Sequence, residues 1–569
     1  MPMPEGWPAE ARGGRVRSRG GGGRVVGSCP GGGGGGGVRR RARGRARGVL
    51  AAVLWPCPGK WLPFRLGSAE TRSACGSGSW HCGSWQSTTQ RAGTPAELPA
   101  PKPPPFHPHA FPRPSQPAPS AAVQPFFHLE PGARGLTCAP RFDQAISTFF
   151  RNLDCRGGDE TEVKVGDGKN PIRTLKARAV LVDMEEGVIG EMLRGPMGDL
   201  FDARMCFGDV SGSGNNWAHG YHVYGPQYCE DFLERVRETT EACDSLQGFF
   251  MMHSLGGGTG SGFGSFAIER LADEYPEVLR FAASVFPSEN DDVVTSPYNS
   301  VFSLNALAEH AECVLPLDNE ALLAVCQRIE KQAQASPMKR GSSISGPEGG
   351  PSEKPYDRMN GIAANMLLNL TSSMRFEGPL NLDLSDITTN LVPFPRMHFL
   401  LSSMSPLGAP KDLGHAAGAR VNTAIDKTFA DAISPANQLL KADPRHSTYL
   451  ACALQFRGPV TATDVDRNVR RWQKQLRMPH WNPDSFRVGL CAVPPVGLPH
   501  SCLVLANSCC FGQKLGTMRD RFSKLYRAKA FVNHYEGNGL LPDEFRENLE
   551  SLEALRDLYA LHDSSASSA

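Results

Sequence analysis

The stretch that decides the fold runs from residue 247 to residue 275 and reads QGFFMMHSLGGGTGSGFGSFAIERLADEY. Its opening apolar run is typical of a buried strand, and Phe266 to Tyr275 has the spacing of a helix. A loop with five glycines, residues 254–262, lies between the strand and the helix. Glycines let the backbone wrap closely around a phosphate, and the following helix directs its free N–H groups and positive dipole end towards the anion.

This order of strand, loop and helix predicts a phosphate-binding loop rather than a flexible glycine linker. The loop is not a Walker A motif, because no Lys-Ser/Thr pair follows it, and it is not the GxGxxG of a dinucleotide site on a first strand. Hydroxyl side chains within it can add donors to those of the backbone. The expected phosphate contacts are Ser254, Gly256, Gly257, Gly258, Thr259 and Gly260.

From about Arg141 onwards, short apolar runs alternate with helical patterns. Residues 179–182 and 281–286 are typical of further buried strands, and helical patterns such as residues 232–236 lie between the strands. This alternation predicts an α/β fold with a parallel sheet.

Residues 1–140 differ in composition from the rest. They carry 18 basic and 5 acidic side chains, a net charge of +13, and because the whole chain is +2 this leaves −11 for residues 141–569. The first 50 residues hold 17 Gly and 11 Arg, and residues 99–131 hold 12 Pro. Such a segment buries too little apolar surface to offset the entropy of ordering its backbone, so we expect residues 1–140 to be disordered.

Three other interpretations of this segment stay open. An Arg/Gly tract can bind RNA or an acidic surface through phosphate-like contacts. The apolar run at residues 49–55 faintly resembles a targeting segment, although it begins too far from the N-terminus for a signal peptide. The third interpretation is that the segment is an artefact of the gene model.

Composition excludes several classes of protein. The opposite charges of the two parts exclude a uniformly basic nucleic-acid binder and a uniformly acidic disordered protein. No stretch reaches the roughly 18 uninterrupted apolar residues of a spanning helix, so we expect a soluble protein without a membrane partner. The 16 cysteines are scattered without a CxxC pair, which favours free thiols over a disulfide scaffold or a zinc site.

The sequence GGGTGSG after a strand resembles the signature of the tubulin/FtsZ family of GTPases, and GSGNNWA at residues 212–218 is similar to the tubulin GAGNNWA loop. Segments that match eukaryotic tubulins rather than FtsZ are residues 297–299, 318–322, 375–376 and 392–396. Residues 146–152, 183–188 and 291–296 look most like the epsilon-tubulin branch. The resemblance extends from about Arg141 to the C-terminus; in residues 1–140 we find neither the family's opening strand nor its GQCGNQIG-like loop.

The resemblance implies a fold and its domains. We expect a tubulin/FtsZ-like GTPase domain with a parallel sheet, an α+β intermediate domain and a C-terminal helical hairpin. The expected bounds are 141–375 for the GTP-binding domain, 376–507 for the intermediate domain and 508–569 for the C-terminal helices. The first of these includes a polar insertion at 332–354 and a core helix at 357–374.

The resemblance also implies a site for GTP or GDP with Mg²⁺. Asp183 and Glu185 match the family's metal-side acids, with solvated acids at a strand end as the alternative. Asn216 in the GSGNNWA loop and Asp292 in the ribose-side loop are further expected contacts of the nucleotide. Asn319 and Asn360 match the two asparagines that read guanine, since an amide donates and accepts at once; a structural role for buried asparagines is the alternative.

Hydrolysis in this family is divided between two subunits, and Asp386 occupies the place of the catalytic acid. It corresponds to the Glu of α-type tubulins and the Lys of β-type tubulins. A carboxylate there can orient the attacking water, but Asp is one methylene shorter than Glu. The alternative is a surface acid in a polar loop.

The implied function is that of an epsilon-tubulin-like GTP-binding cytoskeletal protein of the cytoplasm. It would act at the centrosome in centriole microtubule organisation and duplication. Its expected partners are other tubulins, bound head to tail, and centriolar proteins. Two alternatives stay open: a non-hydrolysing centriolar scaffold with a tubulin fold, and an RNA-binding protein that acts through the Arg/Gly N-terminus.

Overall fold

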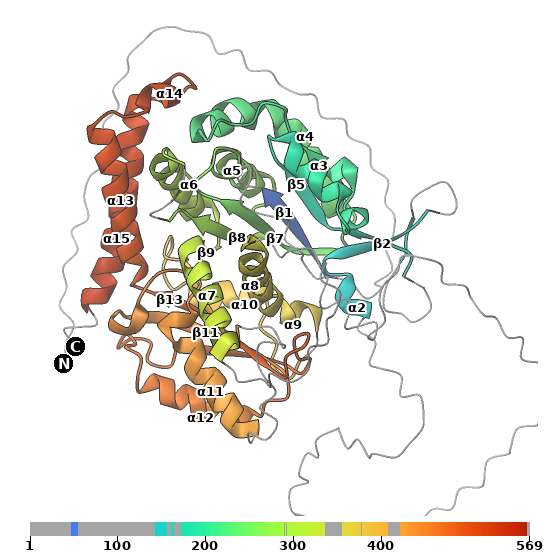
Figure 1. The fold of residues 1–569 in the computed structure, drawn as a ribbon, viewed down its shortest axis with the longest axis vertical. Coiled ribbons are helices and arrows are strands. Elements are labelled where there is room, and N and C mark those ends of the chain that lie inside the picture. The colour runs from blue at the N-terminus through green and yellow to red at the C-terminus, as the bar shows by residue number, and fades with distance from the viewer. Residues whose placement is uncertain are drawn as a thin grey trace, which may run out of the picture. The chain divides into compact units, whose positions relative to one another are not determined.

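A computed structural model describes residues 47–54, 143–155, 161–163, 172–288, 291, 293–335, 355–376, 378–407 and 421–565 (Figure 1). These residues belong to one unit that extends from Arg45 to Ala569. Among them, no helix combines the length and the apolar character needed to cross a bilayer. The described cysteines are free thiols, as the sequence predicts.

The centre of the fold is a six-stranded sheet in which every neighbouring pair is parallel. Its strands, in spatial order, are β6 (Cys206–Phe207), β5 (Ala179–Val182), β1 (Arg47–Leu54), β7 (Ser245–Ser254), β8 (Leu279–Phe286) and β9 (Cys313–Asp318). The predicted α/β class and the three predicted strands are confirmed.

Strand β1 corrects the expectation that the chain lacks an opening strand. It lies between β5 and β7, where Ala51 pairs with Ala179 on one side and with Phe250 on the other. Strands inside a parallel sheet are short, unbroken apolar runs. The run VLAAVL at residues 49–54 fits that description, but it follows an Arg/Gly tract and no other local feature marks it as a strand. The predicted disorder is therefore wrong for residues 47–54, while the rest of residues 1–140 lies outside those described.

The two faces of the sheet carry separate hydrophobic cores, because successive residues of a strand point to opposite sides. Phe249 and Met251 of β7 pack in the core that contains the helices α4 (Gly225–Glu241), α5 (Gly264–Glu274) and α6 (Ser296–His310). Phe250 and Met252 pack in the core that contains α7 (Asn319–Ala335), α8 (Pro355–Leu370) and α10 (Leu384–Leu391).

The predicted core helix ends earlier than expected. Helix α8 stops at Leu370, and a short helix, α9 (Ser372–Arg375), follows the break. The carbonyl of Leu367 accepts from both the hydroxyl of Thr371, at 2.8 Å, and its N–H, at 3.0 Å; such a back-bond from Thr often bends a helix. At the other end of the predicted insertion, α7 continues to Ala335, and residues 336–354 lie outside those described.

A second sheet of four strands has the order β10 (Leu400–Ser405), β13 (Ser501–Ser508), β11 (Tyr449–Arg457) and β12 (Phe486–Cys491). Its pairs are antiparallel except for the parallel pair β11–β12. Helices α11 (Val421–Ile433) and α12 (Ala462–Gln473) pack on one face through Phe429 and Trp472. The predicted domain bounds at 375/376 and 507/508 stay predictions.

The chain closes with α13 (Phe511–Arg527), the short α14 (Val532–Glu536) and α15 (Pro542–Ser565). Figure 1 shows α13 and α15 side by side, as the predicted helical hairpin requires. Their apolar stripes join the core around α6, where Phe522, Tyr535 and Phe545 surround Tyr298 at ring-centroid distances of 5.0 to 5.5 Å.

Smaller elements complete the fold. A three-stranded sheet has the order β3 (Thr161–Glu162), β2 (Phe150–Asp154) and β4 (Thr174–Ala177). The remaining helices and turns are α2 (Asp143–Ile146), α3 (Glu186–Arg194), η1 (Gly198–Leu200), η2 (Ala203–Met205), η3 (His219–Tyr224), η4 (Thr259–Phe263), η5 (Pro435–Asn437) and η6 (Pro444–His446).

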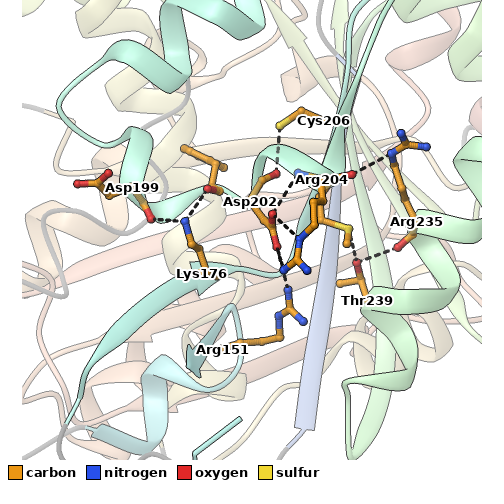
Figure 2. A network of polar contacts seen from close by, with 10 residues as sticks. Arg151, Lys176, Asp199, Asp202, Arg204, Cys206, Arg235 and Thr239 are labelled. Carbon is orange, nitrogen blue, oxygen red and sulfur yellow. Dashed lines mark hydrogen bonds and ion pairs between the residues drawn. The ribbon is translucent and has the colours of Figure 1, made fainter. Parts of the chain in front are cut away.

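Polar contacts hold the segment before β6 against this small sheet and against α4 (Figure 2). The Asp202 carboxylate lies 3.8 Å from the guanidinium of Arg151 on β2 and 2.9 Å from that of Arg204. Lys176 on β4 donates to two main-chain carbonyls of the same segment, and Arg235 on α4 donates to the Arg204 carbonyl at 3.0 Å. This network fixes the edge of the main sheet.

Candidate functional site

The glycine loop leaves the carboxyl end of β7, near the middle of the main sheet. The N–H of Leu255 donates to the carbonyl of Val285 at 3.0 Å, which ties the start of the loop to β8. The loop then enters η4, a π-helical turn, and continues into α5. Open crevices at the carboxyl ends of parallel strands are the usual ligand sites of such sheets. The strand–loop–helix order predicted from the sequence is therefore present.

One glycine of this loop is required by a close approach of two backbones. A Cβ on Gly258 would lie 2.7 Å from the backbone nitrogen of Asn216 and 2.8 Å from the Cβ of Ser213. The Thr259 and Ser213 hydroxyls are 3.1 Å apart and lie at the same contact. Residues 254–262, which we call the phosphate loop, thus pack directly on residues 212–218, which we call the GSGNNWA loop.

Two buried polar side chains form hydrogen bonds with backbone carbonyls of the phosphate loop. His253 makes a 2.8 Å hydrogen bond between its Nδ1 and the carbonyl of Gly260, and its Nε2 lies 2.9 Å from the Ser284 hydroxyl. Burial lowers the pKa of His253 to about 4, so the ring is neutral at physiological pH. The Ser261 hydroxyl donates to the carbonyl of Gly257.

Asn216 lies in this region, but its side chain already has protein partners. Its Nδ2 donates to the carbonyl of His534 at 3.0 Å, and its Oδ1 accepts from the N–H of Ala218 at 2.9 Å. The amide therefore holds the GSGNNWA loop on α14. These two bonds use one of its two N–H groups and one of the two lone pairs of its oxygen, so a direct side-chain contact with a nucleotide would use the second of either.

The two acids predicted on the metal side follow β5 at the same edge of the sheet. Asp183 is 4 % exposed, and its Oδ1 accepts from the N–H of Glu185 at 3.2 Å. Burial raises the pKa of Asp183 to about 7, and the charge of Glu185 adds to the effect. Because β5 and β7 are separated only by β1, the acids lie roughly 10 Å across the sheet from the phosphate loop.

These acids fit a Mg²⁺ ion that is coordinated by carboxylates and phosphate together. Within the described ranges no group of three or more His, Cys, Asp or Glu side chains could hold a metal ion by itself. Mg²⁺ is commonly bound by one or two carboxylates together with water and substrate phosphates. Asp183 and Glu185 supply that number of carboxylates.

The residues predicted to read the base lie on the two helices of the other face. Asn319 is the first residue of α7, directly after β9, and its Oδ1 is buried with no hydrogen-bond partner among the described residues. Asn360 is 6 % exposed on α8, which is joined to α7 by the 2.7 Å ion pair of Arg358 and Glu330. A ligand that donates to the Asn319 amide oxygen would supply the partner that the described residues do not.

The ribose-side residue cannot be placed, since Asp292 lies outside the described residues. Its neighbour Asp291 is close to the phosphate loop, because a Cβ on Gly256 would lie 3.0 Å from the Asp291 Oδ2. Ser296 lies at the same point: the hypothetical Cβ would be 3.5 Å from the Ser296 Cβ. The Ser296 hydroxyl is buried and has no hydrogen-bond partner in the described part of the chain. No local pattern in the sequence indicates this position of Ser296.

Asp386 lies at the opposite end of the main sheet. Leu384 of the same helix, α10, packs against Gly248 near the start of β7, since a Cβ on that glycine would lie 3.2 Å from the Leu384 Cδ1. Six residues of extended strand separate Gly248 from Ser254, a length of about 20 Å. Asp386 therefore does not meet the phosphate loop of its own chain.

The Asp386 carboxylate has a structural partner within α10. It accepts from the N–H of Asp383 at 3.4 Å, while the Asp383 carboxylate accepts from the N–H of Asp386 at 2.9 Å, a reciprocal capping box. The guanidinium of Arg487 lies 3.6 Å from Asp386, and the Asp386 side chain is 37 % exposed. The carboxylate is thus accessible while it caps its helix.

The site contains one further residue that sequence analysis used only as part of a family-like motif. Asn299, in the first turns of α6, is completely buried and bonds to both the phosphate loop and the GSGNNWA loop. Its partners are far away in the sequence, so no local signal beyond the Pro297-Tyr298-Asn299 motif could have indicated this role.

Comparisons with known proteins agree with this architecture. Residues 128–327 match the Tubulin/FtsZ family, GTPase domain, and residues 395–519 match the Tubulin C-terminal domain. The chain is 47 % identical to the tubulin epsilon chain of Mus musculus over 431 residues, which are 74 % of this chain and 88 % of that protein. The tubulin epsilon chain of Homo sapiens is also 47 % identical, over 430 residues with the same coverage. The tubulin alpha-1 chain of Saccharomyces cerevisiae is 34 % identical over 448 residues, 77 % of this chain and 90 % of that protein.

Proposed function

The chain belongs to the tubulin family, and from this premise we propose that it binds GTP and GDP with Mg²⁺ as an epsilon-type tubulin of the centriole. Guanine-nucleotide binding follows from its GTPase domain. The contacts assigned to individual residues, the metal ion and the centriolar role are the proposal.

The observation that carries the proposed site is the contact between the phosphate loop and the GSGNNWA loop at Gly258. Only a residue without a Cβ allows the approach, and the result is a backbone cradle at the carboxyl end of β7. Helix α5 behind the cradle adds its positive end, which favours a polyphosphate. In this proposal Ser254, Gly256, Gly257, Gly258, Thr259 and Gly260 contact the phosphates.

The remaining contacts follow from the edges of this cradle. Asp183 and Glu185 would hold Mg²⁺ together with phosphate oxygens, and the ion would screen negative charge. Asn319, whose amide oxygen is buried without a partner in the described chain, would read the guanine together with Asn360. Asn216 would keep the GSGNNWA loop in place, and Asp292 would face the ribose.

Hydrolysis would need two subunits. Because Asp386 and the phosphate loop lie at opposite ends of one sheet, a head-to-tail contact brings the acid of one subunit to the nucleotide of the next. Other tubulins are therefore the proposed neighbours, and Asp386 the proposed acid that orients water. The half-exposed carboxylate is compatible with such a contact.

A second candidate is a tubulin-fold scaffold that binds nucleotide without hydrolysing it. The capping box favours it, since Asp386 already uses its carboxylate to accept from the backbone of its own helix, and Asp is shorter than Glu. Comparing Asp386→Glu with Asp386→Asn separates the two functions. A hydrolysing protein gains or keeps phosphate release in the first variant and loses it in the second, whereas a scaffold shows equally little release in both.

The proposed site is tested by titrating the full chain with a fluorescent GTP analogue in the presence of Mg²⁺. We expect saturable binding that unlabelled GTP displaces and ATP does not. The centriolar role is tested separately by locating the tagged protein in cells, where we expect it to coincide with a centriole marker. A uniform distribution in cells that contain centrioles would contradict that role while leaving nucleotide binding intact.

A further inference from the structure

Asn299 forms a junction between three segments that are far apart in the sequence. Its Nδ2 donates to the carbonyl of Asn215 at 2.8 Å and to the carbonyl of Gly256 at 2.9 Å. Its Oδ1 accepts from the N–H of Trp217 at 3.0 Å and from the hydroxyl of Tyr535 at 2.6 Å. The side chain is completely buried.

These four bonds use the whole capacity of the carboxamide. A primary amide has two N–H donors and an oxygen with two lone pairs, and here each has a partner. The partners belong to the phosphate loop, the GSGNNWA loop and α14. Because no bonding capacity is spare, one of these segments cannot shift alone without leaving a buried polar group unpaired, which is costly.

Helix α14 is joined to the nucleotide loops by more than this one bond. The carbonyl of His534 accepts from the side chain of Asn216 at 3.0 Å, and Asn538 just beyond the helix lies 2.8 Å from the ring of His219. The hydroxyl of Tyr535 is therefore the part of α14 that reaches the phosphate loop itself, through Asn299. Helix α14 thus contacts the GSGNNWA loop directly and the phosphate loop through Asn299.

We propose that Asn299 and Tyr535 are a positioning pair that fixes the phosphate loop in its nucleotide-binding shape and couples nucleotide occupancy to the docking of α14. The inference rests on the proposed function. A bound phosphate stabilises the loop conformation to which Asn299 bonds, and the same conformation presents the Asn299 oxygen to Tyr535. Since coupling between two binding equilibria is reciprocal, α14 strengthens nucleotide binding as much as nucleotide strengthens its docking.

The fold offers a matched control for the test. Tyr298 and Tyr535 are neighbouring buried tyrosines, with ring centroids 5.5 Å apart, and each donates a hydrogen bond that crosses between α6 and the C-terminal region. The Tyr298 hydroxyl donates to the carbonyl of Ala530 at 3.0 Å and not to Asn299. Tyr535→Phe and Tyr298→Phe each remove one oxygen, and both leave the ring packing in place. In the first variant the Asn299 oxygen still accepts from the N–H of Trp217, so we expect the fold to be retained.

The experiment measures binding of a fluorescent GTP analogue and amide hydrogen exchange of residues 532–536, with and without GTP, in the full chain. We expect Tyr535→Phe to weaken binding about fivefold, the equivalent of about 1 kcal/mol for one lost hydrogen bond. Tyr298→Phe should stay within about twofold of the unaltered chain, at a similar loss of thermal stability. GTP should slow exchange in residues 532–536 of the unaltered chain and of Tyr298→Phe, and clearly less in Tyr535→Phe.

Equal binding by the two variants would overturn the inference, as would exchange in α14 that ignores GTP. If instead the unaltered chain binds no guanine nucleotide, the proposed function fails and the coupling fails with it. The two failures are thus distinguishable, because the first occurs in a protein that binds GTP and the second in one that does not.

Discussion

Replacing Gly258 with alanine tests whether the contact between the two loops determines nucleotide affinity. The new Cβ would lie 2.7 Å from the backbone nitrogen of Asn216, whereas ordinary contacts begin near 3.4 Å, so the loops must separate by about 0.7 Å. The nearest atom, the Ser213 hydroxyl oxygen, can rotate away, but the backbone nitrogen of Asn216 and the Cβ of Ser213 cannot, so relaxation has to move the backbone. Overpacking of this kind costs about 1–3 kcal/mol.

We expect this strain to appear in the affinity, because the bound nucleotide requires the loop in its original place. A loss of about 1–3 kcal/mol corresponds to a dissociation constant raised about 5- to 150-fold. The assay is titration of a fluorescent GTP analogue, accompanied by urea unfolding to measure stability. A Gly258→Ala variant that is folded and binds as tightly as the unaltered chain would refute the reasoning.

Gly516→Ala is the control for this substitution. Gly516 lies within α13, and a Cβ there meets no atom within 4 Å. Alanine is the better helix former, so this change should raise the free energy of unfolding by about 0.5–1 kcal/mol and leave nucleotide binding unaltered. A loss of binding in this variant would show that the assay responds to alanine substitution in general.

Three further predictions concern the strand, the acid and the histidine. Ala51→Pro removes a backbone donor in the middle of β1 and should lower the free energy of unfolding by about 2–4 kcal/mol. The control, Ala462→Pro at the first residue of α12, should be tolerated. Equal melting temperatures of the two variants would contradict the central position of β1. Asp386→Ala removes half of the capping box and should lower the free energy of unfolding, measured in urea, by about 1 kcal/mol. The GTP dissociation constant should stay within about twofold, because the acid lies at the far end of the sheet from the phosphate loop. A large loss of affinity would contradict that placement. In the unfolded chain a histidine takes up its proton near pH 6.5, whereas in the folded chain His253 does so only near pH 4. Its contribution of about 3 kcal/mol to the free energy of unfolding is therefore present above pH 6.5 and is lost as the pH falls towards 4. His253→Asn should flatten the pH dependence of the free energy of unfolding, and an unchanged slope would count against the burial of the neutral ring.

Local patterns were enough to predict the strand, loop and helix that follow one another around the candidate site. The glycine loop between β7 and α5 carries its own evidence, because the strand, the loop and the helix follow one another. The apolar face of α8 has the spacing of a buried helix, whereas the acids after β5 were assigned from the family resemblance. Each of these features lies within one continuous segment of the sequence.

Features that depend on distant pairing could not be predicted. Strand β1 is recognisable only from its partners β5 and β7, which lie about 130 and 200 residues further along the chain. The bond between Asn299 and Tyr535 spans 236 residues. The capping box of Asp386 is different, because an acid three residues after an N-cap Asp is a local signature that the sequence contains.

The central claim is that the phosphate loop after β7 holds a guanine nucleotide. The most direct measurement is the nucleotide content of the full chain, purified in Mg²⁺ without added nucleotide, denatured and resolved by chromatography. We predict close to one guanine nucleotide per chain, and clearly less from Gly258→Ala purified in parallel. A folded chain that elutes empty and takes up no GTP when it is supplied would contradict the account.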